Sequence, residues 1–147
     1  MKFAKIDHVS VPVNDVERSR DFYSRVLGLQ EIPRPSFSFA GIWYKLGDVA
    51  IHIIENEVSK EDPDRSDLSA RYAHIAFFMD TQEELKKFIE KIKAENIPWY
   101  ELENSPTGLH QVFFKDPDGN MIEVLAPNPQ NPYYESVYLK YMAGNAE

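Results

Sequence analysis

The sequence predicts an α+β fold built from two copies of one β-α-β-β-β module, and three observations support this prediction. A strand pattern at residues 6–14 recurs 66 positions later, at residues 72–80. Each copy is followed by an amphipathic helical stripe, and then by a series of short strand patterns. Because a module of about 60 residues is marginally stable alone, we expect the two modules to pair, within one chain or with another.

The two initial strands each carry a histidine on the face opposite their apolar side chains. Side chains alternate along a strand, so Val9, Val11 and Val13 share one face and His8 lies on the other. In the second copy His74 has the same position. We expect the following helix to cover the apolar face, which leaves each histidine on the uncovered face.

The two helices have similar start and stop signals. The first is predicted to begin at Asn14, with Glu17 completing a capping box, and to end at Gly28. The second is predicted to begin at Thr81, with Glu84 at the same offset, and to end at Asn96. Their apolar stripes consist of Val16, Phe22, Tyr23, Val26 and Leu27 in the first helix, and of Leu85, Phe88, Ile89 and Ile92 in the second.

Short strand patterns fill the rest of both modules. In the first module they cover 29–33, 37–46 and 49–55; in the second they cover 99–103, 110–115 and 121–126. The turns 106–108 and 116–120 divide the second set. We therefore place module one at about 4–56, a linker at about 57–70, module two at about 71–126 and a C-terminal extension at 127–147. Tyr134, Val137, Tyr138, Tyr141 and Met142 have helical spacing, which predicts a helix in the extension that packs on the body or on a partner.

Composition limits the functional class. The 147 residues carry a net charge of −8, which argues against a nucleic-acid or acidic-membrane partner. There is no apolar signal segment and no long apolar run, so we expect a single cytoplasmic domain. The absence of cysteine excludes disulfides and thiolate ligands, so any metal site must use His, Asp or Glu.

The last strands of the two modules also carry a polar residue between apolar neighbours. His52 stands between Ile51 and Ile53, and Glu123 stands between Ile122 and Val124. An ionised Glu is costly to bury without a partner, and a divalent cation would offset that cost. We therefore predict a metal site formed by His8, His52, His74 and Glu123, for which Zn, Fe, Ni, Mn or Co is suitable.

These segments resemble the vicinal oxygen chelate superfamily, which includes glyoxalase I, bleomycin resistance proteins and extradiol dioxygenases. The resemblance covers about residues 4–126, and its most specific part is the turn 116–120 (DPDGN) followed by Ile122 and Glu123. It implies a cupped mixed sheet of paired modules with the helices outside. It also implies a metal bound inside the cup by His8, His52, His74 and Glu123, and a homodimer that completes the cup in many members.

The superfamily binds two neighbouring substrate oxygens to the metal and stabilises the charge that develops on them. The resemblance thus implies a glyoxalase I-like lyase or isomerase that forms an enediolate from a small oxygenated or thiol-conjugated metabolite, with Glu123 as the base. One departure is His52, which stands where the glyoxalase pattern usually has a second carboxylate.

Other branches remain as alternatives. A fosfomycin-type thiol transferase would use His8, His74 and Glu123, whereas an extradiol-type dioxygenase would use one ligand fewer than the four present. A metal-free, bleomycin-resistance-like binding protein would have no need of the four ligands. Secondary candidates are Trp43, Tyr44, Trp99 and Tyr100 as cavity walls or sheet packing, Arg34 and Lys115 as contacts to an anionic substrate, and His110, which we expect at the surface.

Overall fold

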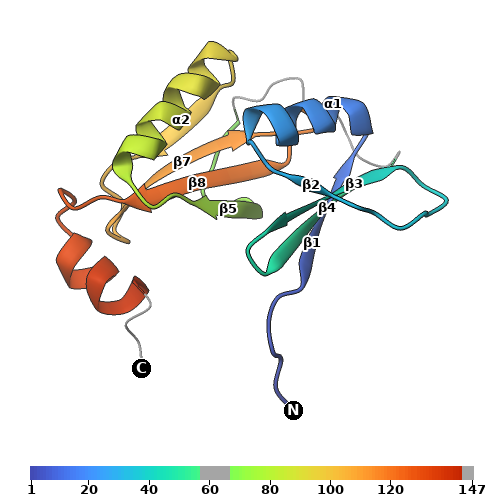
Figure 1. Ribbon diagram of the computed structural model, residues 1–147. Helices are drawn as coiled ribbons and strands as arrows, with labels where there is room; N and C mark the ends of the chain where they lie inside the picture. The colour runs from blue at the N-terminus through green and yellow to red at the C-terminus, as the bar shows by residue number, and fades with distance from the viewer. Residues whose placement is uncertain (57–66, 144–147) are drawn as a thin grey trace. The chain divides into compact units, whose positions relative to one another are not determined.

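The computed structural model describes residues 1–56 and 67–143, which form parts of two compact units. Unit 1 consists of Met1–Pro63 together with Asp116–Asn120, and unit 2 consists of Asp64–Lys115 together with Met121–Glu147. Most of the predicted linker, 57–70, lies outside the described residues. Figure 1 shows the ribbon of both units.

Unit 1 contains a four-stranded mixed sheet with the strand order β1-β4-β3-β2. Strand β1 runs parallel to β4, while β3 is antiparallel to both β4 and β2. A short α-helix, α1, continues directly into a wider helical segment, η1, in which the Leu27 N–H reaches back five residues to the Phe22 carbonyl. The elements are β1 (His8–Val13), α1 (Val16–Arg20), η1 (Asp21–Val26), β2 (Glu31–Ile32), β3 (Gly41–Leu46) and β4 (Val49–Glu55).

Unit 2 repeats this arrangement with the strand order β5-β8-β7-β6. Its parallel pair is β5 with β8, and the remaining pairs are antiparallel. The elements are β5 (His74–Phe78), α2 (Gln82–Ala94), β6 (Trp99–Leu102), β7 (Leu109–Lys115), β8 (Met121–Pro127) and the C-terminal helical segment η2 (Tyr134–Met142). The predicted α+β fold with two β-α-β-β-β modules is thus confirmed.

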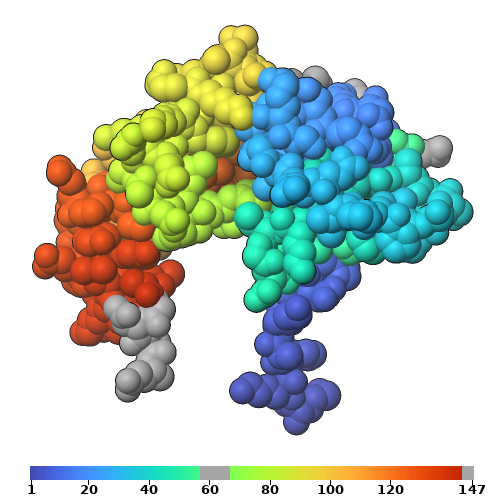
Figure 2. Space-filling model, viewed as in Figure 1, coloured from blue at the N-terminus to red at the C-terminus, as the bar shows by residue number. Residues whose placement is uncertain are grey.

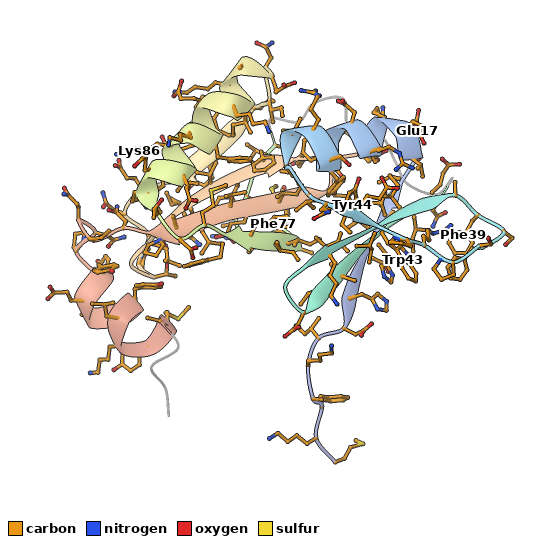
Figure 3. The ribbon with its side chains drawn as sticks, in the orientation of Figure 1. Glu17, Phe39, Trp43, Tyr44, Phe77 and Lys86 are labelled. Carbon is orange, nitrogen blue, oxygen red and sulfur yellow. The ribbon has the colours of Figure 1, made fainter. Side chains whose placement is uncertain are left out.

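Each helix covers the apolar face of its own sheet. In unit 1 the buried ring of Tyr23 stacks on the ring of Tyr44, and in unit 2 Phe88 of α2 packs against Phe114 of β7. Figure 3 shows Tyr44 on the side of the sheet that carries α1, and Trp43 on the other side. The histidine-bearing faces are therefore left uncovered by these helices, as predicted.

The predicted helix signals are confirmed except at the first start. Thr81 caps α2 by accepting the Glu84 N–H, and Gly28 and Asn96 have positive φ angles of 71° and 54° after the helices. The first cap is Asp15, whose carboxylate accepts two backbone N–H groups of α1, and not Asn14. Asn14 instead donates its backbone N–H to Asp118, a contact that helix periodicity does not reveal.

Two strands are shorter than the sequence suggests. The pattern at 29–33 yields only the two residues of β2, because Pro33 and Pro35 lack the N–H that a longer ladder needs. The pattern at 37–46 becomes a strand only from Gly41 onward. Before that point Phe37 and Phe39 pack on the side chain of Arg34 within the β2–β3 loop.

The turn Asp116–Asn120 belongs to unit 1 although it connects two strands of unit 2. The buried carboxylate of Asp116 accepts the Tyr23 hydroxyl at 2.8 Å, and Asp118 accepts a guanidinium N–H of Arg18 at 2.9 Å. Burial raises the pKa of Asp116 against the hydrogen bonds that Asn120 and Tyr23 donate to it. Burial also raises the pKa of Tyr23, and the charge and hydrogen bond of Asp116 raise it further. These contacts give the turn a packing role in addition to its role as a connection.

The C-terminal extension packs on the rest of unit 2. Packing on the body of the chain was one of the two arrangements predicted for it, and packing on a partner was the other. The buried amide of Asn131 donates to the carbonyls of Ser105 and Leu109. Gly108 has a φ of +83°, and a Cβ atom there would lie 2.7 Å from the Cβ of Tyr138 in η2. Among the described residues, no helix is long and apolar enough to cross a membrane.

We predict that Gly108→Ala destabilises the protein by about 3 kcal/mol, because the new methyl group adds a clash with η2 to the cost of a positive φ angle. Gly28→Ala is the matched control, since its φ is also positive but a Cβ atom there has open space. Its loss should be about 1 kcal/mol. Urea unfolding checks both values, and equal losses would show that η2 does not press on Gly108.

Candidate metal site

In unit 2 the predicted ligands His74 and Glu123 form a close pair. The Nε2 atom of His74 lies 2.8 Å from Oε2 of Glu123. Glu123 is only 5% exposed, while its neighbours Ile122 and Val124 are buried on the opposite face of β8. The sheet register accounts for the encounter, because Ala76 stands opposite Glu123 across the parallel β5–β8 pair and His74 lies two residues earlier on the same face.

Further hydrogen bonds fix both side chains. Nδ1 of His74 lies 2.6 Å from the backbone carbonyl oxygen of Tyr72, and the Gln111 amide donates to Oε1 of Glu123 at 2.6 Å. An imidazole whose Nδ1–H is held by a carbonyl presents Nε2 as its ligand atom. A divalent ion can therefore take the place of the proton between His74 and Glu123 with little rearrangement of either group.

Aromatic side chains line this pair. Phe113 stands opposite Glu123 across the β7–β8 pair and meets the His74 ring edge-on, with 5.7 Å between centroids. Tyr100 stacks on Phe113 in turn, at 6.0 Å. The carboxylate of Glu123 thus lies beside rings that keep water away, where a charge interacts strongly with a bound cation.

In unit 1 the predicted ligands His8 and His52 also come together, but as a stack. Their ring centroids are 4.3 Å apart with 17° between the ring planes, and His52 lies in turn 4.1 Å from Trp43 at 7°. Ser10 stands opposite His52, as Ala76 stands opposite Glu123. Since Ser10 and Ala76 are 66 positions apart, His52 and Glu123 occupy equivalent places in the two sheets.

The stack restricts what these two imidazoles can bind. The ligand lone pairs of an imidazole lie in the ring plane, and metal–nitrogen bonds are about 2.0–2.1 Å long. Rings that are nearly parallel and 4.3 Å apart direct their lone pairs side by side. His8 and His52 therefore bind the same ion only if one ring turns out of the stack.

The surroundings of His8 and His52 bear on their charge. Nδ1 of His8 lies 2.9 Å from the carboxylate of Asp7, which leaves Nε2 as the outward ligand atom, and this hydrogen bond lowers the pKa of Asp7. Burial, followed by the charges of His8 and Arg34, lowers the pKa of His52 and offsets the opposite effect of Asp7. The neutral imidazole is the form that binds metal.

The four predicted ligands thus meet as two pairs, one in each unit. Within the described part of each unit, no group of three or more His, Asp or Glu side chains forms a metal cluster. The donor chemistry of His74, Glu123 and His8 fits a divalent ion, since each has an outer hydrogen-bond partner that orients it. That all four hold one ion stays a prediction.

Sequence reasoning missed the outer partners Gln111 and Asp7. Gln111 could have been found, because it lies two residues before Phe113 and therefore on the same face of β7. Phe113 stands opposite Glu123 across the β7–β8 pair. Among the residues predicted as cavity walls, Trp43 stacks on His52, and Tyr100 stacks on Phe113, which contacts His74. Tyr44 lies on the helix-covered face, where its hydroxyl contacts Ser24, and Trp99 stands opposite Phe114 on the corresponding face of unit 2.

The prediction that His110 lies at the surface is wrong. Its side chain is buried on the helix-covered face, where Nδ1 lies 3.0 Å from Oε1 of Gln82 and Nε2 lies 3.0 Å from Oε2 of Glu101. The alternation of side chains along β7 explains the burial, because His110 shares a face with Val112 and Phe114, and Phe114 packs against α2. Lys115 is also buried, with its ammonium group 5.8 Å from the ring centroid of Tyr72.

We predict that His52 titrates below 6.5 in the metal-free protein, because burial and the nearby cationic groups disfavour its charged form. The folded state then binds fewer protons at His52 than the unfolded chain. Stability should therefore fall as the pH drops from 6.5 toward the folded pKa. Nuclear magnetic resonance titration of the imidazole signals measures this, and His8→Gln should move the His52 pKa upward, whereas an unchanged value would exclude coupling within the stack.

Comparisons with known proteins agree with this architecture. Residues 5–124 match the family model described as Glyoxalase/Bleomycin resistance protein/Dioxygenase superfamily. The chain is 30% identical to "Glyoxylase I 4" of Arabidopsis thaliana over 125 residues, 84% of this chain and 71% of that protein. It is 26% identical to "Metallothiol transferase FosB" of Lysinibacillus sphaericus over 127 residues, 84% of this chain and 82% of that protein. The crystal structure of a putative glyoxalase family protein from Bacillus anthracis matches with a TM-score of 0.66 and 27% identity, over 87% of this chain and 98% of that one.

Proposed function

The chain belongs to the glyoxalase/bleomycin resistance protein/dioxygenase superfamily, and from this premise we propose that it is a metal-dependent enzyme with glyoxalase I-like chemistry. Its substrate would be a small oxygenated or thiol-conjugated metabolite. The ligands would come from His74 and Glu123 in unit 2 and from His8 in unit 1, with His52 as the fourth when its ring turns. The working form would be a homodimer, as in other members of the family.

The observation that carries this proposal is the buried pair of His74 and Glu123. A carboxylate at 5% exposure requires a cationic or hydrogen-bonding partner, and among the described residues Glu123 has one imidazole and one amide as partners. Residues chosen only for packing would be apolar here, as Ile122 and Val124 are on the other face. The polar set is therefore best explained by a bound cation.

Each side chain would have a distinct role. When bound, a divalent ion would act as a Lewis acid toward two neighbouring oxygens of the substrate. Glu123 would accept a proton from the adjacent carbon through Oε2, while Gln111 holds Oε1. Phe113 would limit the access of water to that carboxylate. Unit 1 would contribute the His8 imidazole, oriented by Asp7.

The stacked position of His52 favours a second candidate function. A thiol transferase of the fosfomycin type would use His8, His74 and Glu123 and needs no fourth ligand, so His52 would remain between His8 and Trp43. The similarity to a protein described as a metallothiol transferase supports the same alternative. In this case Glu123 would serve as a ligand and not as a base.

Activity assays on metal-reconstituted protein separate the two candidates. Protein loaded in turn with Ni, Zn, Co and Mn would be incubated with the methylglyoxal–glutathione adduct, and separately with fosfomycin and a small thiol. We expect loss of the adduct with at least one metal. Turnover of fosfomycin alone would replace the first candidate by the second, and oxygen uptake with catechols would overturn both.

We predict that His74→Ala lowers metal affinity by a factor of about 10 or more, because it removes one ligand and leaves Glu123 buried without its partner. His110→Gln is the matched control, since this buried histidine lies on the opposite face of the same sheet. Metal content after dialysis against a competing chelator measures both. A reduced affinity only in the control, or in neither variant, would contradict the assignment of His74.

A further inference from the structure

Arg34 in the β2–β3 loop of unit 1 has a half-buried guanidinium group without a carboxylate partner among the described residues. Its carbon Cζ lies 4.7 Å from the ring centroid of Phe37 and 5.1 Å from that of Phe39. One terminal nitrogen donates to the Phe39 carbonyl at 2.9 Å. Its Nε–H is buried and has no acceptor within the described structure.

A second arginine near Arg34, Arg20, differs from it because it is paired with carboxylates. Arg20 and Arg34 both line a surface cavity of about 700 Å³ in unit 1, together with Glu17 and Glu31. Both carboxylates pair with Arg20, and the hydrogen bond that Arg20 donates to Glu31 raises the Arg20 pKa. The charge of Arg20 is therefore neutralised internally, whereas no carboxylate among the described residues neutralises that of Arg34, which can pair with an anion.

A close approach of the backbone holds Arg34 in this position. A Cβ atom on Gly41 would lie 2.6 Å from the Ile53 carbonyl oxygen and 3.1 Å from Nε of Arg34. Any larger residue at the start of β3 would push the guanidinium away from the strand. The glycine thus creates the space in which Arg34 lies.

A row of rings connects Arg34 with the candidate metal ligands of unit 1. Phe37 lies 6.1 Å from Trp43, measured between ring centroids, and Trp43 stacks on His52 at 4.1 Å. Figure 3 shows Phe39 and Trp43 in the same region of unit 1, on the side of the sheet away from α1. Phe37 and Trp43 are tilted by 47° to each other, so the row offers an uneven apolar surface with a cation at one end and imidazoles at the other. Such a surface suits a ligand with an anionic group beside an apolar part.

We propose that Arg34 is the anion-recognising residue of unit 1, and that its ligand is a small molecule with a carboxylate or phosphonate group attached to an apolar segment. The anion would pair with the guanidinium, and the apolar segment would lie against Phe37 and Trp43. This inference deepens the proposed function, on which its catalytic meaning rests, by giving the substrate a negative charge remote from the metal.

Fluorescence of Trp43 provides the test. The chain has two tryptophans, so in a Trp99→Phe background Trp43 is the single reporter. Chelator-treated protein would be titrated with phenylphosphonate and with its uncharged counterpart, benzyl alcohol. We expect saturable quenching by phenylphosphonate and at least tenfold weaker binding of benzyl alcohol.

Variants then assign the binding to Arg34. Arg34→Met should weaken phenylphosphonate binding at least tenfold, and Arg34→Lys should retain part of it, because the charge remains while the planar fork is lost. Lys45→Met is the matched control, since it removes an exposed cation from β3, the strand that carries Trp43, and should leave binding unchanged. Near-ultraviolet circular dichroism verifies that each variant is folded. If Arg34→Met does not fold, the weaker binding expected for Arg34→Lys provides the test.

Three results would overturn the inference. They are the absence of saturable quenching up to about 10 mM phenylphosphonate, equal binding by the Arg34 variants and the parent, and an equal loss in Lys45→Met. The metal content of each protein is measured separately. Anion binding without metal binding would reject the proposed function and keep the role of Arg34, whereas metal binding without Arg34-dependent anion binding would do the reverse.

Discussion

A buried carboxylate imposes the strongest constraint on this molecule. Glu123 lies in the middle of a strand whose neighbours Ile122 and Val124 are almost fully buried, and its own exposure is 5%. An ionised group in such a place is stable only with a cationic partner and filled hydrogen bonds. In the described structure its partners are His74 and Gln111, at 2.8 and 2.6 Å. In the chemistry that we propose, a bound divalent ion would supply positive charge to the same carboxylate.

The two units place different polar residues at equivalent positions of the same sheet architecture. In each, the helix covers one sheet face, and the other face presents polar side chains at equivalent positions of the parallel strand pair. In unit 2 the outcome is the close contact of His74 with Glu123, and in unit 1 it is a stack of His8, His52 and Trp43. The replacement of a carboxylate by His52 changes both charge and shape, because an imidazole can stack on a tryptophan where a carboxylate cannot.

The N-terminal residues 1–7 precede β1 and extend from unit 1 without a strand or helix (Figure 2). Phe3 and Ile6 are strongly exposed there, at 88% and 68%. Asp7, the last residue of this segment, is nevertheless hydrogen-bonded to His8. The start of the sheet therefore coincides with the start of the candidate site, so a change in this segment would act on His8 through Asp7.

The repeat and the strand faces could be predicted from the sequence, because side-chain alternation and the 66-residue offset can be recognised in the chain itself. The sequence predicted that all four ligands share one ion, and the described structure brings them together as two pairs. Asp15 was missed as the cap because Asn14 and Asp15 are both common capping residues, and Glu17 stands three residues after Asn14 as in a capping box. The burial of His110 was missed although the alternation that placed Glu123 would have placed it too. The stack of His52 could not be predicted, since ring orientation depends on the partners that surround it and not on spacing.

Anomalous diffraction from crystals grown with Co²⁺ tests the central claim most directly, because it locates the ion and its ligand atoms in the same experiment. We predict one strong peak within about 2.2 Å of Nε2 of His74 and of an oxygen of Glu123, with Nε2 of His8 completing the set. A structure at full Co²⁺ loading in which His74 and Glu123 still contact each other directly, with no anomalous peak beside them, would contradict the account.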